Sequence, residues 1–407
     1  MTVAAQLANL LQEGSVSTSD ADLAAHSSDW APAEMLRGRR GETPELPSCV
    51  VRPASTQEVA TLLRWAHETS TPLVPWGGGS GVLASVAPGG TVVVDLGRLD
   101  AIGPVDDKSL IVSAGGGVTG PALTSALAAR GYMLGHEPQS LAISTVGGWI
   151  ATRACGQLSA RYGGIESILA GFTAVLPGGG VVRSKTVPRR AAGPDVASLL
   201  IGSEGTLGIV TEADLRVSRI PRERADLCIR FEHMSDGVAA CRLLAQSELR
   251  PTVVRLYDPE DAAIFLRHFP EEGPGPLLLL SFDGDSSARR SEAAAALCGG
   301  ERGGGEPSGT HLVAHWWAHR NDAVGEFRRL MAGDGLLGPH ALVDTMEVSG
   351  TWTVLRDLYH SMKEKLAAEA DIVGCHVSHV YRDGACLYFT LASACDDDAE
   401  AAVTLER

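Results

Sequence analysis

A glycine-rich loop directly after an apolar strand constrains this chain more than any other feature. The loop runs from Pro75 to Val82 and carries glycine at four of the five positions from 77 to 81. Glycine adopts positive φ without strain and lets the main chain approach a ligand without a clash at Cβ. Successive backbone N–H groups in such a turn form a concavity that binds anions such as a pyrophosphate. The loop therefore predicts a phosphate-containing ligand, with an ordinary glycine turn as the alternative.

Two familiar phosphate-binding motifs do not fit the loop. No Gly-Lys-Ser/Thr follows, so it is not a P-loop, and the chain continues into a proline turn at Pro88 and a strand rather than into a helix. The net charge of −15 argues against nucleic acid and against insertion into, or binding to, an anionic membrane. An anionic ligand must therefore be held by local backbone N–H groups and a few basic side chains.

Apolar patterning around the loop predicts an α+β fold rather than a regularly alternating doubly wound sheet. In the first half we expect helices at Thr2–Glu13, Thr56–Thr69 and Gly120–Arg130, strands at Cys49–Val51, Leu73–Val74, Thr91–Leu96 and Ser109–Ser113, and an irregular Ser15–Arg40. In the second half we expect strands at 227–233, 252–256, 277–282 and 384–391, and helices at 234–247, 286–297, 352–369 and 399–407. The boundary between the two halves is expected near Pro221.

Length and cysteine usage limit the class of protein. A chain of 407 residues predicts two or three domains. No run of 18 apolar residues and no basic segment ahead of an apolar one occurs, so neither a membrane-spanning helix nor a secretory signal is expected. The eight cysteines contain no C-x-x-C pair, which is typical of reduced thiols and favours a cytoplasmic protein.

Two further motifs follow the loop in a fixed order. Gln139–Gly148 is a turn-rich stretch ending in a double glycine, with Thr152–Cys155 just after it, and Ile201–Ala213 carries glycines ahead of an apolar strand. Together with the first loop, these segments resemble the FAD domain of the vanillyl-alcohol oxidase / p-cresol methylhydroxylase family over roughly residues 44 to 220.

The resemblance implies a fold, a cofactor and a set of contacts. It implies an N-terminal helical segment (1–43), a two-lobed FAD-binding domain of the p-cresol methylhydroxylase type (44–220) and an α+β substrate or cap domain (221–407). The first loop would bind the pyrophosphate, residues 139–156 would line the isoalloxazine, and a strand at 204–210 would contact the adenosine half. The FAD contacts implied are Pro75, Trp76, Gly77, Gly78, Gly79, Ser80, Gly81, Val82, Gln139, Ser140, Leu141, Ser144, Thr145, Gly148, Thr152, Arg153, Ala154, Cys155, Glu204, Gly205, Leu207, Gly208, Ile209 and Val210. In covalent members a histidine follows the glycines of the first loop; here no histidine lies between residues 68 and 135, so we expect non-covalent FAD.

Further segments resemble one branch, the alkylglycerone-phosphate synthases. They include Gly135–Pro138, Trp149–Ala154, Arg255-Leu256 and the stretch from Cys375 to Phe389. Carried over residue by residue, Tyr388 would be the acid/base, Arg255 would pair with a carboxylate or leaving fatty acid, and His136 would lie near the flavin. A guanidinium does match a carboxylate, and a tyrosine acts as a base only where a cation or the flavin stabilises its phenolate. A core tyrosine and a surface arginine are the alternatives.

No metal site is expected. His376 and His379 are three residues apart, but the related D-2-hydroxyacid dehydrogenases carry a metal motif whose second ligand position falls here on Asp383. The synthase branch also carries consecutive histidines in a C-terminal segment that covers the flavin, and the chain ends at Arg407 before such a run. We therefore expect the substrate domain to lack that segment.

Three functions follow as hypotheses. The first is a synthase-like flavoenzyme, linked by the resemblance to ether-lipid biosynthesis, that forms a flavin–substrate adduct on a small oxygenated or phosphorylated substrate without net oxidation. The second is an FAD-linked oxidase or dehydrogenase of a 2-hydroxy acid, because one fold serves many reactions. The third is FAD binding without turnover. The sequence leaves a homodimer possible.

Overall fold

The computed structural model describes residues 1–86, 89–188, 193–299, 303–335 and 337–406. The chain forms two compact units, the first comprising Met1–Cys155 and Gly163–Ile220, the second Gly156–Tyr162 and Pro221–Arg407. Within the described ranges, no helix combines the length and apolar character needed to cross a membrane. The expected turn at Pro88 and the last residue of the expected helix 399–407 lie outside these ranges.

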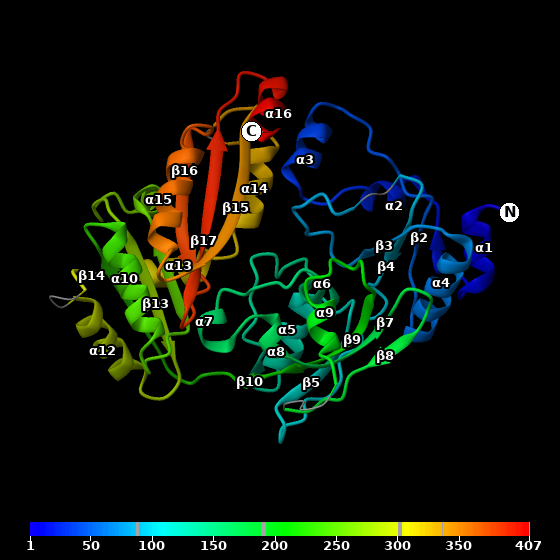
Figure 1. Cartoon of the computed structure of the whole chain (residues 1–407), viewed down its shortest axis with the longest axis horizontal. Coiled ribbons are helices and arrows are strands. Elements are labelled where there is room, and N and C mark those ends of the chain that lie inside the picture. The colour runs from blue at the N-terminus through cyan, green and yellow to red at the C-terminus, as the bar shows by residue number, and fades with distance from the viewer. Residues whose placement is uncertain (87–88, 189–192, 300–302, 336, 407) are drawn as a thin grey trace. The chain divides into compact units, whose positions relative to one another are not determined.

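The first unit begins with a small sheet in the order β1-β2-β4-β3, in which β2, β4 and β3 run parallel (Figure 1). Its elements are α1 Val3–Leu10, β1 Val16–Ser17, α2 Asp20–Ala25, α3 Pro32–Arg39, β2 Cys49–Val51, α4 Thr56–Thr69, β3 Leu73–Trp76 and β4 Val92–Asp95. The strand β2 and the helix α4 match the predicted bounds, and Ser55 caps α4 by accepting from the Glu58 N–H at 3.2 Å. The apolar sides of α1 and α4 pack on this sheet in one core.

The prediction of an irregular Ser15–Arg40 was wrong. This segment forms β1 and the helices α2 and α3. Both helices are shorter than three turns, so apolar periodicity cannot reveal them, but their starting residues could have done so. Ser19 caps α2, and Pro32 occupies the first turn of α3.

A second, antiparallel sheet of the first unit has the order β5-β9-β7-β8. Its strands are β5 Ile111–Gly115, β7 Leu169–Val175, β8 Val181–Arg183 and β9 Ile209–Arg216; around them lie β6 Tyr132–Met133, β10 Ser218–Arg219, α5 Gly120–Ala128, α6 Val146–Ala151, α8 Ile165–Ile168 and α9 Val196–Leu200. The expected strand at 204–210 in fact starts at Ile209, so residues 204–208 form the loop that leads into β9.

The second unit is built on one seven-stranded antiparallel sheet in the order β14-β11-β13-β12-β16-β17-β15. The strands are β11 Arg224–Arg230, β12 Val253–Tyr257, β13 Leu277–Asp283, β14 Glu306–Ser308, β15 Leu342–Thr351, β16 Ile372–Ser378 and β17 Gly384–Ser393. The helices are α7 Ser159–Tyr162, α10 Met234–Ala245, α11 Pro259–Phe265, the 3₁₀ turn η1 Leu266–His268, α12 Ser287–Gly299, α13 His311–His319, α14 Ala323–Met331, α15 Leu355–Leu366 and α16 Asp398–Glu406.

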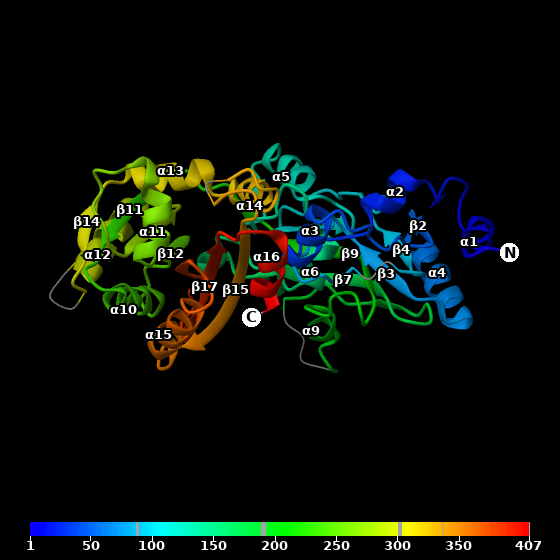
Figure 2. The ribbon, with the colours of Figure 1, turned by 90° about the horizontal axis from the view of Figure 1, so that it is seen from above.

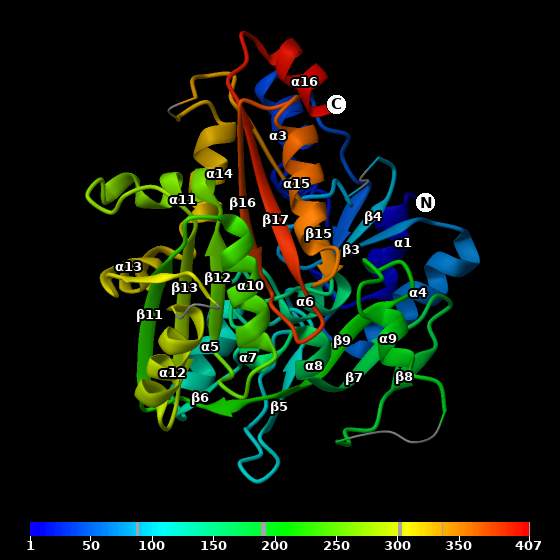
Figure 3. The same cartoon turned by 60° about the vertical axis from the view of Figure 1, so that its left-hand side comes forward.

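The two faces of this sheet differ in character. Alternate residues such as Leu256, Leu280 and Phe389 point into an apolar core under α10, α12 and α15, which lie on the same face in Figure 3. The residues between them, including Arg255, Ser281 and Tyr388, point to the opposite face, where Figure 2 places α11 and α13. Since side chains of a strand alternate between faces, the apolar face secures the fold and leaves the other face for polar groups.

The apolar face should dominate the stability of the second unit. Leu256 is fully buried in its core, so Leu256→Ala should lower the free energy of unfolding by about 2–5 kcal/mol. Ile264→Ala removes an apolar side chain that is 40% exposed and should change it by less than about 0.5 kcal/mol. Urea denaturation followed by circular dichroism measures both. Equal effects of the two substitutions would contradict this assignment of the core.

Candidate functional site

The three glycine motifs meet in the first unit. A Cβ at Gly77 would lie 2.5 Å from the hydroxyl oxygen of Thr145, and one at Gly78 would overlap the carbonyl oxygen of Ile143. The first loop thus lies directly against the start of the second motif. Only glycine permits this approach.

The third motif contacts both of the others. A Cβ at Gly205 would lie 2.8 Å from Cγ of Pro75, and Gly205 has a φ of +76°. The Gly202 and Glu204 N–H groups donate to the carbonyl oxygens of Ile150 and Ala151 at 3.0 and 2.9 Å. Segments far apart in sequence therefore form one backbone cluster, in which the predicted FAD contacts Pro75, Gly77, Gly78, Thr145 and Gly205 meet.

A fourth glycine segment of this cluster was missed by the sequence analysis. A Cβ at any of Gly115, Gly116 and Gly117 would overlap a backbone carbonyl oxygen, and the Gly147 N–H donates to the Gly116 oxygen at 2.8 Å. The three consecutive glycines were a visible signal. They extend the backbone cluster under α6.

A buried carboxylate fixes the far end of the first loop. The carboxyl group of Asp29 accepts from the N–H groups of Ala31 and Ser85, each at 3.0 Å, and the Trp30 N–H donates to the Gly81 oxygen at 2.7 Å. Burial and the charge of Asp29 raise the pKa of Glu204 in the third motif. Asp29 thus holds the loop in place, and neither carboxylate supplies positive charge, so an anion would depend on backbone N–H groups.

An ionic network lies behind Trp76. The His26 and Trp76 rings are 4.9 Å apart, and His26 Nε2 lies 3.4 Å from the Asp95 carboxylate. Arg52 donates to Asp95 at 2.7 Å and to both carboxylate oxygens of Asp22. Burial disfavours the charged imidazole, but the bonds to Asp95 and Asp22 outweigh it and raise the pKa of His26. The network joins α2 to β2 and β4 beneath the loop.

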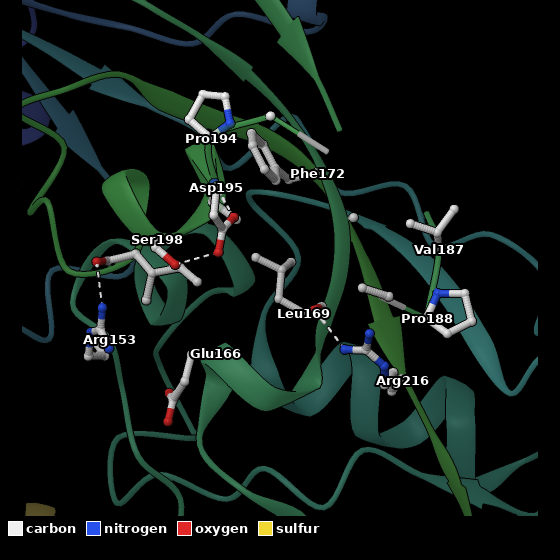
Figure 4. Close-up of a pocket in the computed structure, with 15 residues that line it drawn as sticks. Arg153, Glu166, Leu169, Phe172, Val187, Pro188, Pro194, Asp195, Ser198 and Arg216 are labelled. Atoms are coloured by element: carbon white, nitrogen blue, oxygen red, sulfur yellow. Dashed lines mark hydrogen bonds between the residues drawn. The ribbon is translucent and has the colours of Figure 1, made fainter. Parts of the chain in front are cut away.

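A separate cavity of about 410 Å³ opens beside β7 and α9 (Figure 4). Arg153 reaches it from the second motif and donates to the Ile201 oxygen at 3.5 Å, while Arg216 donates to the Leu169 oxygen at 2.7 Å. Asp195 accepts from the Ser198 hydroxyl at 2.5 Å. Of the predicted FAD contacts, only Arg153 lines this cavity.

His136 belongs to the first unit, whereas the other two predicted catalytic residues belong to the second. It is buried, and its ring lies 4.9 Å from that of Trp149, whose indole donates to Ser144 at 2.7 Å. These contacts join His136 to the second glycine motif.

His376, one of the two histidines for which no metal site was expected, links Arg255 to Tyr388. Tyr257, His376 and Tyr388 face one another on β12, β16 and β17, and the His376 and Tyr388 rings stack at 4.9 Å. Arg255 donates to the Tyr257 hydroxyl at 2.9 Å and lies 3.0 Å from Nε2 of His376. We call Arg255, Tyr257, His376 and Tyr388 the sheet cluster.

Ionisation in the sheet cluster is restrained by burial. Burial and the neighbouring Arg255 lower the pKa of His376 to about 4. Burial raises the pKa of Tyr388, and Glu347 reinforces this, while Thr345 and Arg255 act in the opposite direction. At neutral pH the imidazole and the phenol are therefore both uncharged.

His379 and its partner Ser159 lie near the sheet cluster. His379 has a φ of +53°, and its Nδ1 lies 2.8 Å from the hydroxyl of Ser159. Burial lowers the pKa of His379 to about 4. In the described part of the chain, no group of three or more His, Cys, Asp or Glu side chains is arranged to hold a metal ion.

Two family models match this chain. A family model described as FAD binding domain matches residues 47–185, and one described as FAD linked oxidases, C-terminal domain, matches 220–405. Alkyldihydroxyacetonephosphate synthase of Dictyostelium discoideum is 28% identical over 417 residues, covering 92% of this chain and 65% of that protein. The uncharacterized FAD-linked oxidoreductase YgcU of Escherichia coli is 32% identical over 357 residues, covering 84% and 72%. A D-lactate dehydrogenase of Anaerostipes hadrus is 32% identical over 251 residues, covering 59% and 53%.

Solved structures agree with the predicted fold. An alkyldihydroxyacetonephosphate synthase matches with a TM-score of 0.84 and 26% identity over 99% of this chain and 78% of that one. The 4-ethylphenol oxidase of Gulosibacter chungangensis matches with a TM-score of 0.76 and 15% identity, over 99% and 84%. The prediction of FAD as cofactor and of a p-cresol methylhydroxylase-type fold is confirmed.

The backbone cluster should be intolerant of side chains at the first loop. Gly78→Ala places a methyl group against the Ile143 oxygen, so we expect the purified protein to lose at least half of its FAD, measured as visible flavin absorbance per protein. Gly38→Ala, in α3 with open space around it, should keep full occupancy. Full occupancy in Gly78→Ala would contradict the role of the loop.

The ionic network should make stability depend on pH through His26. Because its pKa is raised in the fold, the protonated ring stabilises the protein below its ordinary pKa of about 6.5, and this contribution disappears as the pH rises through the raised value. The free energy of unfolding should therefore fall from about pH 6 to about pH 8.5 by more in the wild type than in His26→Gln. Identical pH dependence of the two proteins in chemical denaturation would rule out this contribution.

Proposed function

The chain belongs to the FAD-linked oxidases, and from that membership we propose an FAD-dependent enzyme that binds its substrate on the polar face of the second sheet. The leading candidate reaction resembles that of alkyldihydroxyacetonephosphate synthase. In it the alkoxy group of a fatty alcohol would replace the acyloxy group of an acylated dihydroxyacetone phosphate, and the fatty acid would be released without net oxidation. Since the chain spans 65% of the length of the Dictyostelium relative, this activity is a proposal for the chain itself.

The sheet cluster is the observation that carries the proposal. It brings a guanidinium, an uncharged imidazole and a phenol together on three adjacent strands, although Arg255 and Tyr388 are far apart in sequence. A core tyrosine and a surface arginine would not need these mutual contacts. The arrangement favours a site that binds an acid group next to a proton donor.

Arg255 and Tyr388 of the sheet cluster, the bound FAD and the backbone cluster each have a proposed role. Arg255 binds the carboxylate of the substrate or of the leaving fatty acid. Tyr388 holds its proton at neutral pH and donates it; to accept one, its phenolate needs stabilisation by the bound substrate or cofactor. Bound FAD, which we propose to be non-covalent, supplies an electrophilic ring able to hold the substrate or to accept a hydride. The backbone cluster with Gly77, Gly78 and Gly205 is the proposed cradle for that cofactor, and His136 is proposed to lie near its ring.

Oxidation of a 2-hydroxy acid is the second candidate, favoured by the similarity to D-lactate dehydrogenase. The two reactions differ in whether the flavin stays reduced. Under the second candidate, anaerobic mixing with D-lactate should bleach the flavin absorbance near ~450 nm lastingly. Under the leading candidate, D-lactate leaves the spectrum oxidised, and fatty acid is released from acylated dihydroxyacetone phosphate in the presence of a fatty alcohol. Lasting bleaching without fatty-acid release would reverse the ranking.

Tyr388→Phe should keep the bound FAD and lower turnover by about 100-fold or more, because it removes a proton donor without changing the shape of the ring. Tyr381→Phe, at an exposed tyrosine of the same unit, is the matched control and should keep wild-type turnover. Fatty-acid release and the visible spectrum measure the two properties. Wild-type turnover in Tyr388→Phe would show that Tyr388 is a core tyrosine without a catalytic role.

A further inference from the structure

His376 and Asp261 hold the guanidinium of Arg255, and neither has a role in the proposed reaction. The guanidinium lies 3.0 Å from Nε2 of His376, and Nδ1 of His376 lies 2.8 Å from the carboxylate of Asp261. Arg255 can only donate and Asp261 can only accept. His376 therefore carries its proton on Nδ1 and presents Nε2 as an acceptor to Arg255.

The position of Asp261 is itself fixed. It lies in the first turn of α11, where the fully buried Asp258 caps the helix by accepting from the Asp261 N–H at 2.9 Å. Asp258 is bound in turn by Lys363 and by the Tyr359 hydroxyl, the latter at 3.0 Å. Lys363 also pairs with Glu260 at 2.9 Å, so its charge is engaged away from the sheet cluster.

Asp261 and His376 reduce the net positive charge that Arg255 presents to a ligand. His376 is neutral, and the Asp261 carboxylate, whose pKa is lowered despite its burial, offsets the guanidinium at close range. On the other side of His376, Tyr388 is uncharged, Glu347 faces it across the strands, and His379 is neutral. Burial also raises the pKa of Asp344, which acts on Tyr388 from β15. Among these groups the summed charge does not exceed zero.

We propose that Asp261 and His376 are positioning and specificity-determining residues, which fix the guanidinium of Arg255 and offset its charge so that the sheet cluster binds a monoanionic carboxylate in preference to a phosphate dianion. This inference rests on the proposed role of Arg255 as an anion-binding residue. A second negative charge on the ligand would meet Asp261 without a matching cation from the cluster. The phosphate of a phosphorylated substrate would therefore bind elsewhere, with its carboxyl-derived end at Arg255.

The preference for a monoanionic carboxylate is tested with two probes of four carbon atoms each, butyrate and butyl phosphate. They are titrated into the FAD-loaded protein by calorimetry at about pH 8, where the phosphate is mostly dianionic. The wild type should bind butyrate at least about 10-fold more tightly than butyl phosphate. Asp261→Asn keeps an acceptor for His376 but removes one negative charge, so it should shift the ratio of the two Kd values by about 10-fold towards butyl phosphate.

Glu260→Gln is the matched control, because it makes the same change of charge one residue earlier on α11, at a side chain that does not contact His376. It should leave the ratio unchanged. An equal shift in both variants, tighter binding of butyl phosphate by the wild type, or binding of neither probe would overturn the proposal.

The positioning role is tested by ¹⁵N NMR of histidine-labelled protein. The wild type and Asp261→Asn should show His376 with its proton on Nδ1, and Arg255→Leu should raise the pKa of His376 by removing the adjacent charge. A proton on Nε2 in the wild type would contradict the arrangement. Because these experiments measure binding and tautomer, they can succeed when neither proposed reaction is observed, and turnover can be observed when they fail.

Discussion

The close approach of backbone segments is the constraint on which the arrangement of the three glycine motifs in the first unit depends. Gly78 lies against the carbonyl of Ile143, and Gly205 lies against Pro75, so no larger residue fits at either contact without displacing the chain. The segments that meet here come from 75–81, 115–117, 143–148 and 202–205. The proposed backbone cradle would fit a chain with a net charge of −15, because N–H dipoles attract an anion without a local excess of lysine or arginine.

The second unit separates stability from binding by the two faces of one sheet. Leu256, Leu280 and Phe389 bury their side chains under helices on one face, so the fold does not depend on the polar residues between them. Those polar residues can then be buried only if they are paired. On this face His376 and Asp261 satisfy each other, and the neighbouring Asp258 at the start of α11 is satisfied by Lys363 and Tyr359 of α15. The polar face is thus rigid as well as hydrogen-bonding, which is what a binding site requires.

Sequence patterns predicted those parts of the molecule that local chemistry decides. Thr56–Thr69 is a long amphipathic helix with a serine cap, and its bounds match the structure residue for residue. The strands β15 and β16 were not predicted, although β16 lies inside the second sheet and β15 forms one of its edges. In β15 the residues from Thr345 to Thr351 are mostly polar and partly exposed, so no apolar alternation marks it as a strand. Its conformation follows from pairing with β17 over ten residues, which is a tertiary interaction.

The candidate site also has parts that the sequence predicts and parts that only the structure reveals. The glycine motifs could be found from sequence because a backbone cradle needs glycine at fixed positions, whereas the partners of Arg255 could not. Asp261 looks like one of several acidic residues at a helix start, and His376 looks like half of a metal motif. Only the register that sets Tyr257, His376 and Tyr388 side by side turns the three into one cluster.

Burial of that cluster limits how it can take part in chemistry. At neutral pH the phenol of Tyr388 keeps its proton and His376 stays uncharged, so the cluster holds one permanent cation, Arg255, balanced by Asp261. A site in this state binds an acid group well but abstracts a proton poorly. Tyr388 could therefore remove a proton only if added positive charge stabilised its phenolate. The same requirement would apply to both proposed reactions.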